Sequence, residues 1–309
     1  MKLIGRLIVQ SNYFALLHHS RKVLMSPAGS EALSIPSASS GDTQEKSQTR
    51  QRLTRAKLEL LSWLVPVVVV VVWELFSRIG YIRPQLLPAP SSVAATAWQM
   101  LLDGTLIEHL SYSLVRATIG FLIGGGIGFA LGILVGFSPL AQAVLDRPIQ
   151  MIRAIPFLAL LPLVIIWFGV DEGGKIFLVA LGVMFPIYIN TVLGIRQVDP
   201  KLLELGRITG LSWAGLVRRI ILPGAMPSIL TGVRYALAVA WLALVVAETL
   251  ATNKGIGFLA MDAREFLQTN VIVLTILIYA FIGVLADGVA RWLERRLLQW
   301  HPNYDKENR

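Results

Sequence analysis

The 309-residue chain has no cysteine, four histidines and few charged residues. The absence of cysteine excludes disulfides, cysteine-ligated zinc and thiol nucleophiles. The histidines are scattered, without metal-ligand spacing or an evident nucleophile partner, and they are interpreted as solvated surface residues: His18, His19, His109 and His301. We therefore expect no catalytic residue, no metal and no cofactor held by this chain, and a function other than that of an enzyme.

Charged residues make up only 15% of the chain, whereas 55% of its residues are hydrophobic. This apolar content exceeds that of a soluble domain and indicates a protein of the lipid bilayer. The net charge of +9 would also suit a nucleic-acid partner. In a membrane protein, however, an excess of Lys and Arg is typical of cytoplasmic loops, so no nucleic acid is expected as a partner.

The composition divides the chain into three parts. Residues 1–56 are interpreted as a disordered basic N-terminal tail, because they lack periodic apolar positions that would offset the entropy of ordering them. Residues 57–300 hold the long hydrophobic segments and form the expected membrane domain, and residues 301–309 form a C-terminal tail.

Six segments approach or exceed the length at which a helix crosses a bilayer. They are residues 58–79, 114–137, 148–168, 175–195, 229–250 and 271–293. Positive charges concentrate on the loops of one side, among them Arg147, Arg196, Arg218 and Arg219. The sequence therefore predicts an all-α, polytopic membrane protein with both termini in the cytoplasm.

The second segment carries a stripe of glycines spaced four residues apart: Gly120, Gly124, Gly128, Gly132 and Gly136. Steps of four residues drift by only about 40° around a helix, so the stripe forms one slowly winding groove. Such a groove lets another helix approach closely, either within the bundle or in a dimer. Helix packing is the favoured interpretation, and a pore-lining role is the alternative.

The third segment contains Pro148, Pro156 and Pro162. Each proline removes a backbone donor and kinks a helix. A broken helix suits a gate, but a kink needed only for packing explains the pattern equally well.

Two features of the sequence bear on the energy source. Gly169, Gly174 and Lys175 satisfy G-x4-G-K, but Ile176 stands where a magnesium-binding hydroxyl is required, so the match is attributed to chance. An ion-coupled carrier would need carboxylates within the membrane. Glu74 and Glu248 lie near span ends, where they can reach the interface, and Asp287 is placed to pair with Arg291 one helical turn later. These carboxylates favour ion-coupled transport only weakly.

The loop at about 196–228 is too long and too regular for a simple connector. Its first part, PKLLELGRIT, predicts a short amphipathic helix beginning at Pro200. Gly210 breaks this helix, and SWAGLVRRIIL predicts a second one that begins after Ser212 and stops at Pro223. The loop is therefore expected to form a pair of short cytoplasmic helices with a hinge between them.

This loop resembles the EAA loop of ABC importer permeases, E-A-A-x3-G-x9-I-x-L-P. Glu204, Gly210, Ile220, Leu222 and Pro223 reproduce its spacing, whereas Leu205 and Gly206 replace its two alanines, which predicts a less regular first helix. Stretches such as WLALVVAETLATNKGIGFLAMDAREFLQTN and LLQWHPNY extend the likeness over about residues 60–300. They are similar to the permeases of aliphatic sulfonate importers, within a group that includes taurine, nitrate and thiamine-precursor permeases.

The resemblance implies a six-helix, type I ABC importer domain in the bacterial cytoplasmic (inner) membrane. The seven loop residues would dock on a separate subunit that binds and hydrolyses ATP. The implied partners are two such subunits, a periplasmic or extracellular substrate-binding protein and a second permease copy in a homodimer. Substrate-contacting residues remain unassigned. The open alternatives are another cargo for the same machinery, an ion-coupled secondary transporter, and a channel or scaffold.

Overall fold

The computed structural model describes residues 61, 64–249 and 252–300. The chain divides into two units, residues 1–65 and 66–309, and almost all described residues belong to the second. The two predicted tails, residues 1–56 and 301–309, lie outside the described residues. Within residues 66–300, the described chain is helical and contains no strand.

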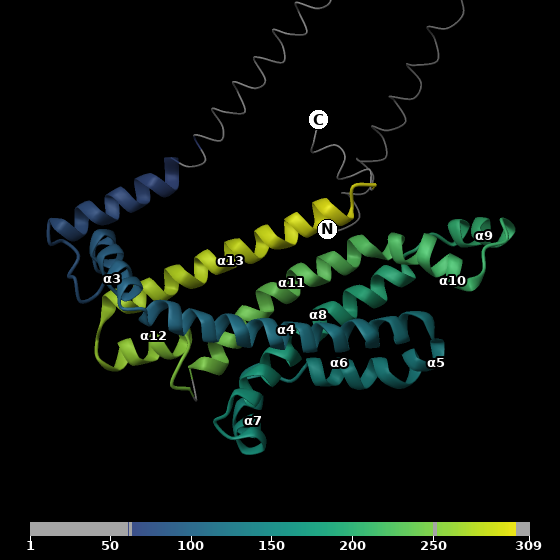
Figure 1. The fold of residues 1–309 in the computed structure, drawn as a ribbon, viewed down its shortest axis with the longest axis horizontal. Helices are drawn as coiled ribbons and strands as arrows, with labels where there is room; N and C mark the ends of the chain where they lie inside the picture. The colour runs from purple at the N-terminus through teal and green to yellow at the C-terminus, as the bar shows by residue number, and fades with distance from the viewer. Residues whose placement is uncertain (1–60, 62–63, 250–251, 301–309) are drawn as a thin grey trace, which may run out of the picture. The chain divides into compact units, whose positions relative to one another are not determined.

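The helices of the second unit follow a segment that is helical over residues 66–78. In chain order they are α3 (Pro90–Leu102), α4 (Thr105–Phe137), α5 (Pro139–Ala141), α6 (Arg147–Arg153), α7 (Leu161–Phe168), α8 (Glu172–Arg196), α9 (Pro200–Ile208), α10 (Trp213–Leu216), α11 (Leu222–Glu248), α12 (Ile256–Glu265) and α13 (Thr269–Leu297). Figure 1 shows the four long helices α4, α8, α11 and α13 running along one another. The all-α fold expected from the sequence is therefore correct.

Four helical stretches of the described part are long and apolar enough to cross a membrane: Thr105–Phe137, Glu172–Arg196, Trp213–Glu248 and Thr269–Leu297. They contain most or all of the second, fourth, fifth and sixth predicted segments. The first predicted segment, 58–79, begins outside the described residues, and its described part is helical.

The third predicted segment, 148–168, is not one continuous helix, which agrees with the broken helix that its prolines suggested. Residues Arg147–Arg153 form α6, a 3₁₀ turn covers Phe157–Leu160, and α7 begins at Leu161. Pro148 lies inside a continuous helical stretch that runs from Pro139 through a π-helical turn at Gln142–Asp146 into α6. Pro162 stands in the first turn of α7, where a missing backbone N–H is tolerated. The helix ends at Arg153, and Pro156 lies in the break before the 3₁₀ turn that leads into α7.

The glycine stripe lies against α8. A Cβ on Gly120 would meet the side chain of Val179 at 2.6 Å, and a Cβ on Gly124 would meet the backbone of Ala180. Gly128 faces the backbone of Met184 in the same way. Gly132 and Gly136 continue the contact, against Thr191 and Ile195. All five glycines thus bring α4 onto α8 within one chain.

The other side of α8 packs on α11. A Cβ on Gly194 would lie 2.8 Å from the carbonyl oxygen of Ala225, and a Cβ on Gly232 would lie 3.0 Å from that of Pro186. Val183 of α8 and Ala240 of α11 are buried together in the core between these helices. Helix α8 is therefore the central element of the unit, with α4 on one side and α11 on the other.

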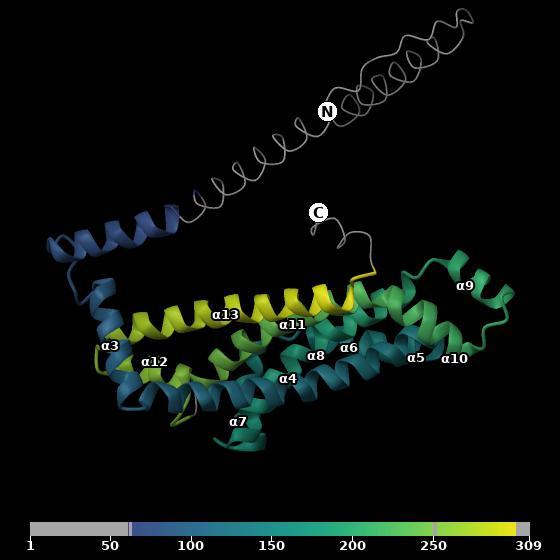
Figure 2. The same cartoon turned by 45° about the horizontal axis from the view of Figure 1, so that its top comes forward.

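Two helices that were not predicted, α3 and α12, lie at one end of the unit (Figure 1). Leu106, Ile256, Leu259 and Val271 form a buried cluster that joins α12 to the starts of α4 and α13. The opposite end carries α5, α9 and α10, as Figure 2 also shows. The long helices thus separate two structurally distinct ends. The second contains the loop at about 196–228 that resembles the EAA loop, called the coupling loop from here on.

Candidate coupling site

The loop after α8 begins with a strongly capped helix. Asp199 accepts a hydrogen bond on its carboxylate from the backbone N–H of Lys201 at 2.9 Å, and Pro200 occupies the first turn of α9. An aspartate cap and an N-terminal proline both favour helix initiation. Although Leu205 and Gly206 replace the two motif alanines, α9 runs unbroken from Pro200 to Ile208.

Gly206 is the contact point of α9. A Cβ at this position would lie 2.7 Å from Cδ1 of Ile220 and 3.4 Å from side-chain atoms of Leu211 and Leu216. The glycine is buried, and it lets the helix sit directly on the segment that leads into α11. Two of the residues predicted to act in coupling, Gly206 and Ile220, are therefore in contact with each other.

The turn after α9 is a Schellman motif. Gly210 has φ +75°, its N–H donates to the carbonyl of Arg207 at 3.0 Å, and the N–H of Leu211 donates to the carbonyl of Gly206 at 3.0 Å. This left-handed conformation favours glycine over residues with a side chain. The predicted break at Gly210 is confirmed, and its cause is conformational, because a Cβ added at this position would meet no atom within 4 Å.

The second helix of the loop does not stop at Pro223, so this expectation is wrong. Ser212 caps α10 by accepting from the N–H of Gly215 at 3.3 Å. The helix then widens into a π-helical turn at Val217–Ile221 and continues as α11 to Glu248. Because the N–H of Leu222 already donates five residues back, to Val217, the chain passes Pro223 without the regular bonding that proline interrupts.

The loop presents large apolar side chains on its surface. Leu205 is 57% exposed, Ile208 83% and Trp213 61%. Glu204 and Gly210 are also exposed, whereas Pro223 is half-buried. Trp213 contacts Phe137 at the end of α4 edge-on, with ring centroids 5.8 Å apart. Of the predicted coupling residues, Glu204 and Leu205 thus lie on the outer surface of the loop. Gly206 and Ile220 lie inside it and join α9 to the segment that leads into α11.

A buried ionic network occupies the opposite end, around Glu248. The carboxylate accepts from Nη1 of Arg116 at 2.7 Å, from the hydroxyl of Ser113 at 2.8 Å and from the N–H of Gly257 at 2.9 Å. The side chains of Glu248 and Arg116 are 0% and 2% exposed. The expectation that Glu248 reaches the membrane interface is therefore wrong, because its helix end is covered by the segment leading into α12.

The same network holds the segment before α12. Arg116 also binds Glu172 through two nitrogens and donates to the backbone carbonyl of Lys254 at 2.6 Å. Gly255, with φ +125°, has no room for a Cβ beside the Glu248 carboxylate. The sequence contained a signal for this site, since Arg116 lies inside the predicted span 114–137, where a charge needs a partner.

His109 belongs to this buried region. Its Nδ1 accepts a hydrogen bond from the N–H of Gly255 at 3.0 Å, and the residue is 9% exposed. The interpretation of His109 as a solvated surface residue is therefore wrong. Nearby, Lys254 and Glu108 form an exposed ion pair at 2.6 Å, and the hydrogen bond from Lys254 to Glu108 raises the pKa of the lysine.

The other charges singled out in the sequence also have partners. Asp287 pairs with Arg291 at 2.5 Å, as predicted, and additionally with Arg234 at 2.6 Å. Lys175, from the chance phosphate-loop match, is buried and donates to Glu172 at 3.2 Å. These groups are bound into structural contacts.

The fold defines a class of protein: an all-helical membrane protein with four long apolar helical stretches and a pair of short helices at one end. The chain belongs to the family described as binding-protein-dependent transport system inner membrane component, whose profile matches residues 127–299. It is thus the permease component of an ABC importer and not an ion-coupled carrier.

Curated relatives of the chain are transport permeases. It is 52% identical to the putative aliphatic sulfonates transport permease protein SsuC of Escherichia coli strain K12, over 80% of this chain and 94% of that protein. It is 45% identical to the protein of the same name from Bacillus subtilis strain 168, over 78% and 88%. The taurine transport system permease protein TauC of Escherichia coli strain K12 is 37% identical, over 76% and 87%.

A solved structure supports the fold. The chain superposes on a chain from a crystal structure of an amino acid ABC transporter with histidines, with a TM-score of 0.54 and 20% identity, over 65% of this chain and 97% of that chain. At this identity the likeness bears on the fold alone.

Proposed function

We propose that the chain is the permease of an importer for aliphatic sulfonates. The relative that is 52% identical along 94% of its length is named for this substrate, and the relative named for taurine, itself an organic sulfonate, is less similar at 37%. Taurine is therefore the second candidate cargo. The permease itself carries out no chemical reaction, and its activity is alternating access of one membrane cavity to the two sides.

The coupling loop is the proposed docking site for a separate ATP-binding subunit. The observation that carries this proposal is the exposed apolar surface of Leu205, Ile208 and Trp213 on two short helices joined at Gly210. Apolar side chains exposed to this extent in water call for a partner. ATP bound between two such subunits would draw two coupling loops together, which requires two permease copies, and so we propose a homodimer.

The charges at the two ends of the helix bundle favour one orientation of the protein across the membrane. Arg196, Lys201, Arg207, Arg218 and Arg219 lie at or beside the coupling loop, which suits the cytoplasm. The other end, with α3, α12 and the network around Glu248, would then face a substrate-binding protein outside the cell membrane. Both termini would be cytoplasmic, and the protein would reside in the inner membrane.

Growth on defined sulfur sources tests this function. A strain lacking its sulfonate permease, complemented with this gene, should grow on ethanesulfonate as sole sulfur source. Growth restored on taurine alone would keep the importer and change its cargo. Failure on both, with the protein present in the membrane, would contradict the assignment of sulfonates.

A further inference from the structure

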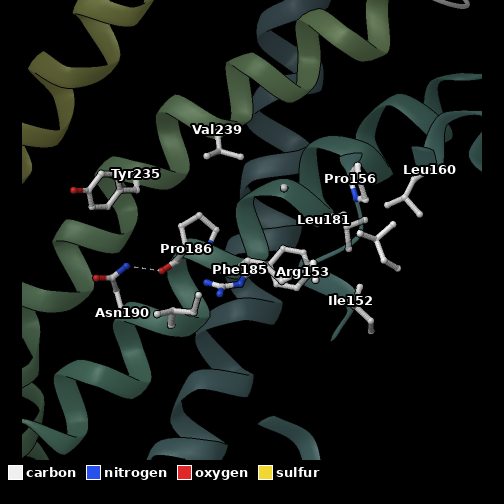
Figure 3. Close-up of a pocket in the computed structure, with 14 residues that line it drawn as sticks. Ile152, Arg153, Pro156, Leu160, Leu181, Phe185, Pro186, Asn190, Tyr235 and Val239 are labelled. Carbon is white, nitrogen blue, oxygen red and sulfur yellow. Dashed lines mark hydrogen bonds between the residues drawn. The ribbon is translucent and has the colours of Figure 1, made fainter. Parts of the chain in front are cut away.

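A cavity of about 630 Å³ opens between α6, α8 and α11, beside the short turn before α7. Figure 3 shows the side chains that line it. Most are apolar, including Leu181, Phe185 and Val239, and the polar ones include Arg153, Asn190 and Tyr235. An apolar cavity of several hundred Å³ with a few polar groups is typical of a small-molecule site.

The cavity lies deep in the membrane domain. Helix α8 has 25 residues and is therefore about 37 Å long, somewhat more than the hydrocarbon core of a bilayer. Leu181 and Phe185 lie near the middle of this helix, and Val239 lies near the middle of α11. A ligand in the cavity would thus sit near the midplane, where a transported molecule must pass.

Arg153 lines this cavity with a guanidinium group that has no anionic partner in the part of the chain that the structure describes. Among the described residues, no carboxylate lies within 4.0 Å of its guanidinium and no hydrogen bond ties it down. Three arginines inside the long helices are bound, in contrast: Arg116 to Glu248, Arg196 to the carbonyl of Val135 and Arg234 to Asp287. A free cation within a membrane domain is costly and marks a functional group.

A second polar group in the cavity is held in place. The side-chain amide of Asn190 donates to the carbonyl of Pro186 at 2.9 Å, a bond drawn in Figure 3. This bond fixes the orientation of the amide and leaves its second N–H available to an acceptor. Pro186 itself lies inside α8, so the amide is anchored on the backbone of this helix.

We propose that this cavity is the site where the permeant anion is bound inside the membrane. The sulfonate group binds the guanidinium of Arg153 and the free N–H of Asn190, and the aliphatic chain lies against Leu181, Phe185 and Val239. A planar guanidinium presents paired N–H donors that match the oxygens of such an anion. The inference rests on the proposed import function and assigns its substrate contact to this chain, in addition to any selection by a binding protein.

The test uses the complete transporter in proteoliposomes, with the permease, the ATP-binding subunit and the binding protein. Arg153→Gln is compared with Arg147→Gln, which removes one positive charge from the other end of α6, outside the cavity. Uptake of ethanesulfonate is measured against its concentration, together with ATP hydrolysis. Arg153→Gln should weaken uptake about tenfold or more, mainly through KM, whereas Arg147→Gln should match wild type.

Two further variants separate substrate contact from folding. Arg153→Lys keeps the charge and should recover part of the uptake. Val239→Phe keeps every polar group but narrows the cavity, so it should reduce uptake of longer alkanesulfonates more than that of ethanesulfonate.

The outcomes are distinct. Wild-type uptake from Arg153→Gln would overturn the proposed site, as would loss of ATP hydrolysis and subunit assembly in that variant, because the arginine would then serve structure. If the wild-type transporter hydrolyses ATP but takes up no sulfonate, the proposed substrate fails instead.

Discussion

The guanidinium of Arg116 on α4 lies 2.7 Å from the carboxylate of Glu248 at the end of α11, and both side chains are buried. The pair joins two helices that are more than a hundred residues apart in sequence. It also connects them, through the carbonyl of Lys254, to the segment before α12. The end of the bundle opposite the coupling loop is therefore held by charge as well as by apolar packing.

Removing the cation of this pair should destabilise the permease strongly. Arg116→Met leaves the Glu248 carboxylate buried without its charge partner, and we expect the free energy of unfolding to fall by about 3–5 kcal/mol. Unfolding in detergent, followed by circular dichroism, measures the change. Lys254→Met removes the exposed partner of Glu108 and serves as the control, with little effect expected. Equal stability of the two variants would contradict the importance of the buried pair.

Helix α4 offers a matched pair of glycines two residues apart, Gly124 in the stripe and Gly126 outside it. Gly124→Ala places a methyl group against the backbone of Ala180 and should lower stability by about 1–3 kcal/mol. Gly126→Ala enters open space and should leave stability unchanged or raise it slightly. The thermal midpoint in detergent distinguishes them, and a loss confined to Gly126→Ala would show that another face of α4 makes the close contact.

Ile208 provides a test of docking. It is 83% exposed on α9, so Ile208→Asp should leave the folding of the permease intact while weakening its association with the ATP-binding subunit about tenfold or more. Copurification of the two subunits measures this. Lys201→Ala, another exposed change on α9, should copurify normally. Normal copurification of Ile208→Asp would move the docking surface elsewhere.

Substitutions at Gly210 test whether the turn depends on backbone conformation rather than on side-chain contacts. Gly210→Val forces a β-branched residue to φ +75° and should cost about 1–2 kcal/mol locally, which disturbs the angle between α9 and α10. Gly210→Asn should be tolerated better, since asparagine adopts this conformation more readily. ATP-dependent uptake should therefore fall much further in Gly210→Val than in Gly210→Asn, and the reverse order would contradict the account of the turn.

Sequence patterns predicted the long helices well because a bilayer imposes both length and apolarity. The expected span 175–195 became α8, Glu172–Arg196, and 271–293 lies inside α13, Thr269–Leu297. Helices α3 and α12 were missed because they are short and only partly apolar. The segment at 148–168 is apolar enough for a crossing, but it is broken between α6 and α7, beside Pro156.

The two short helices of the loop were predictable because their signals are local: a proline that starts the first helix, a glycine that ends it and a serine that caps the second. The partners of Glu248 were not predictable, although Arg116 inside a span was one signal, because Ser113 and Arg116 reach the carboxylate from a distant part of the chain. His109 was misjudged for the same reason, since its partner is the backbone of Gly255. Burial produced by tertiary contacts leaves little trace in the spacing of single residues.

The central claim is that this permease uses ATP hydrolysed by a partner to import a sulfonate. The most direct measurement is uptake of labelled ethanesulfonate into proteoliposomes that contain the permease, the ATP-binding subunit and the sulfonate-binding protein. We predict accumulation with ATP, and none when ATP or the ATP-binding subunit is omitted. Accumulation driven by an ion gradient without ATP, or no uptake by an assembled and ATP-hydrolysing complex, would contradict the claim.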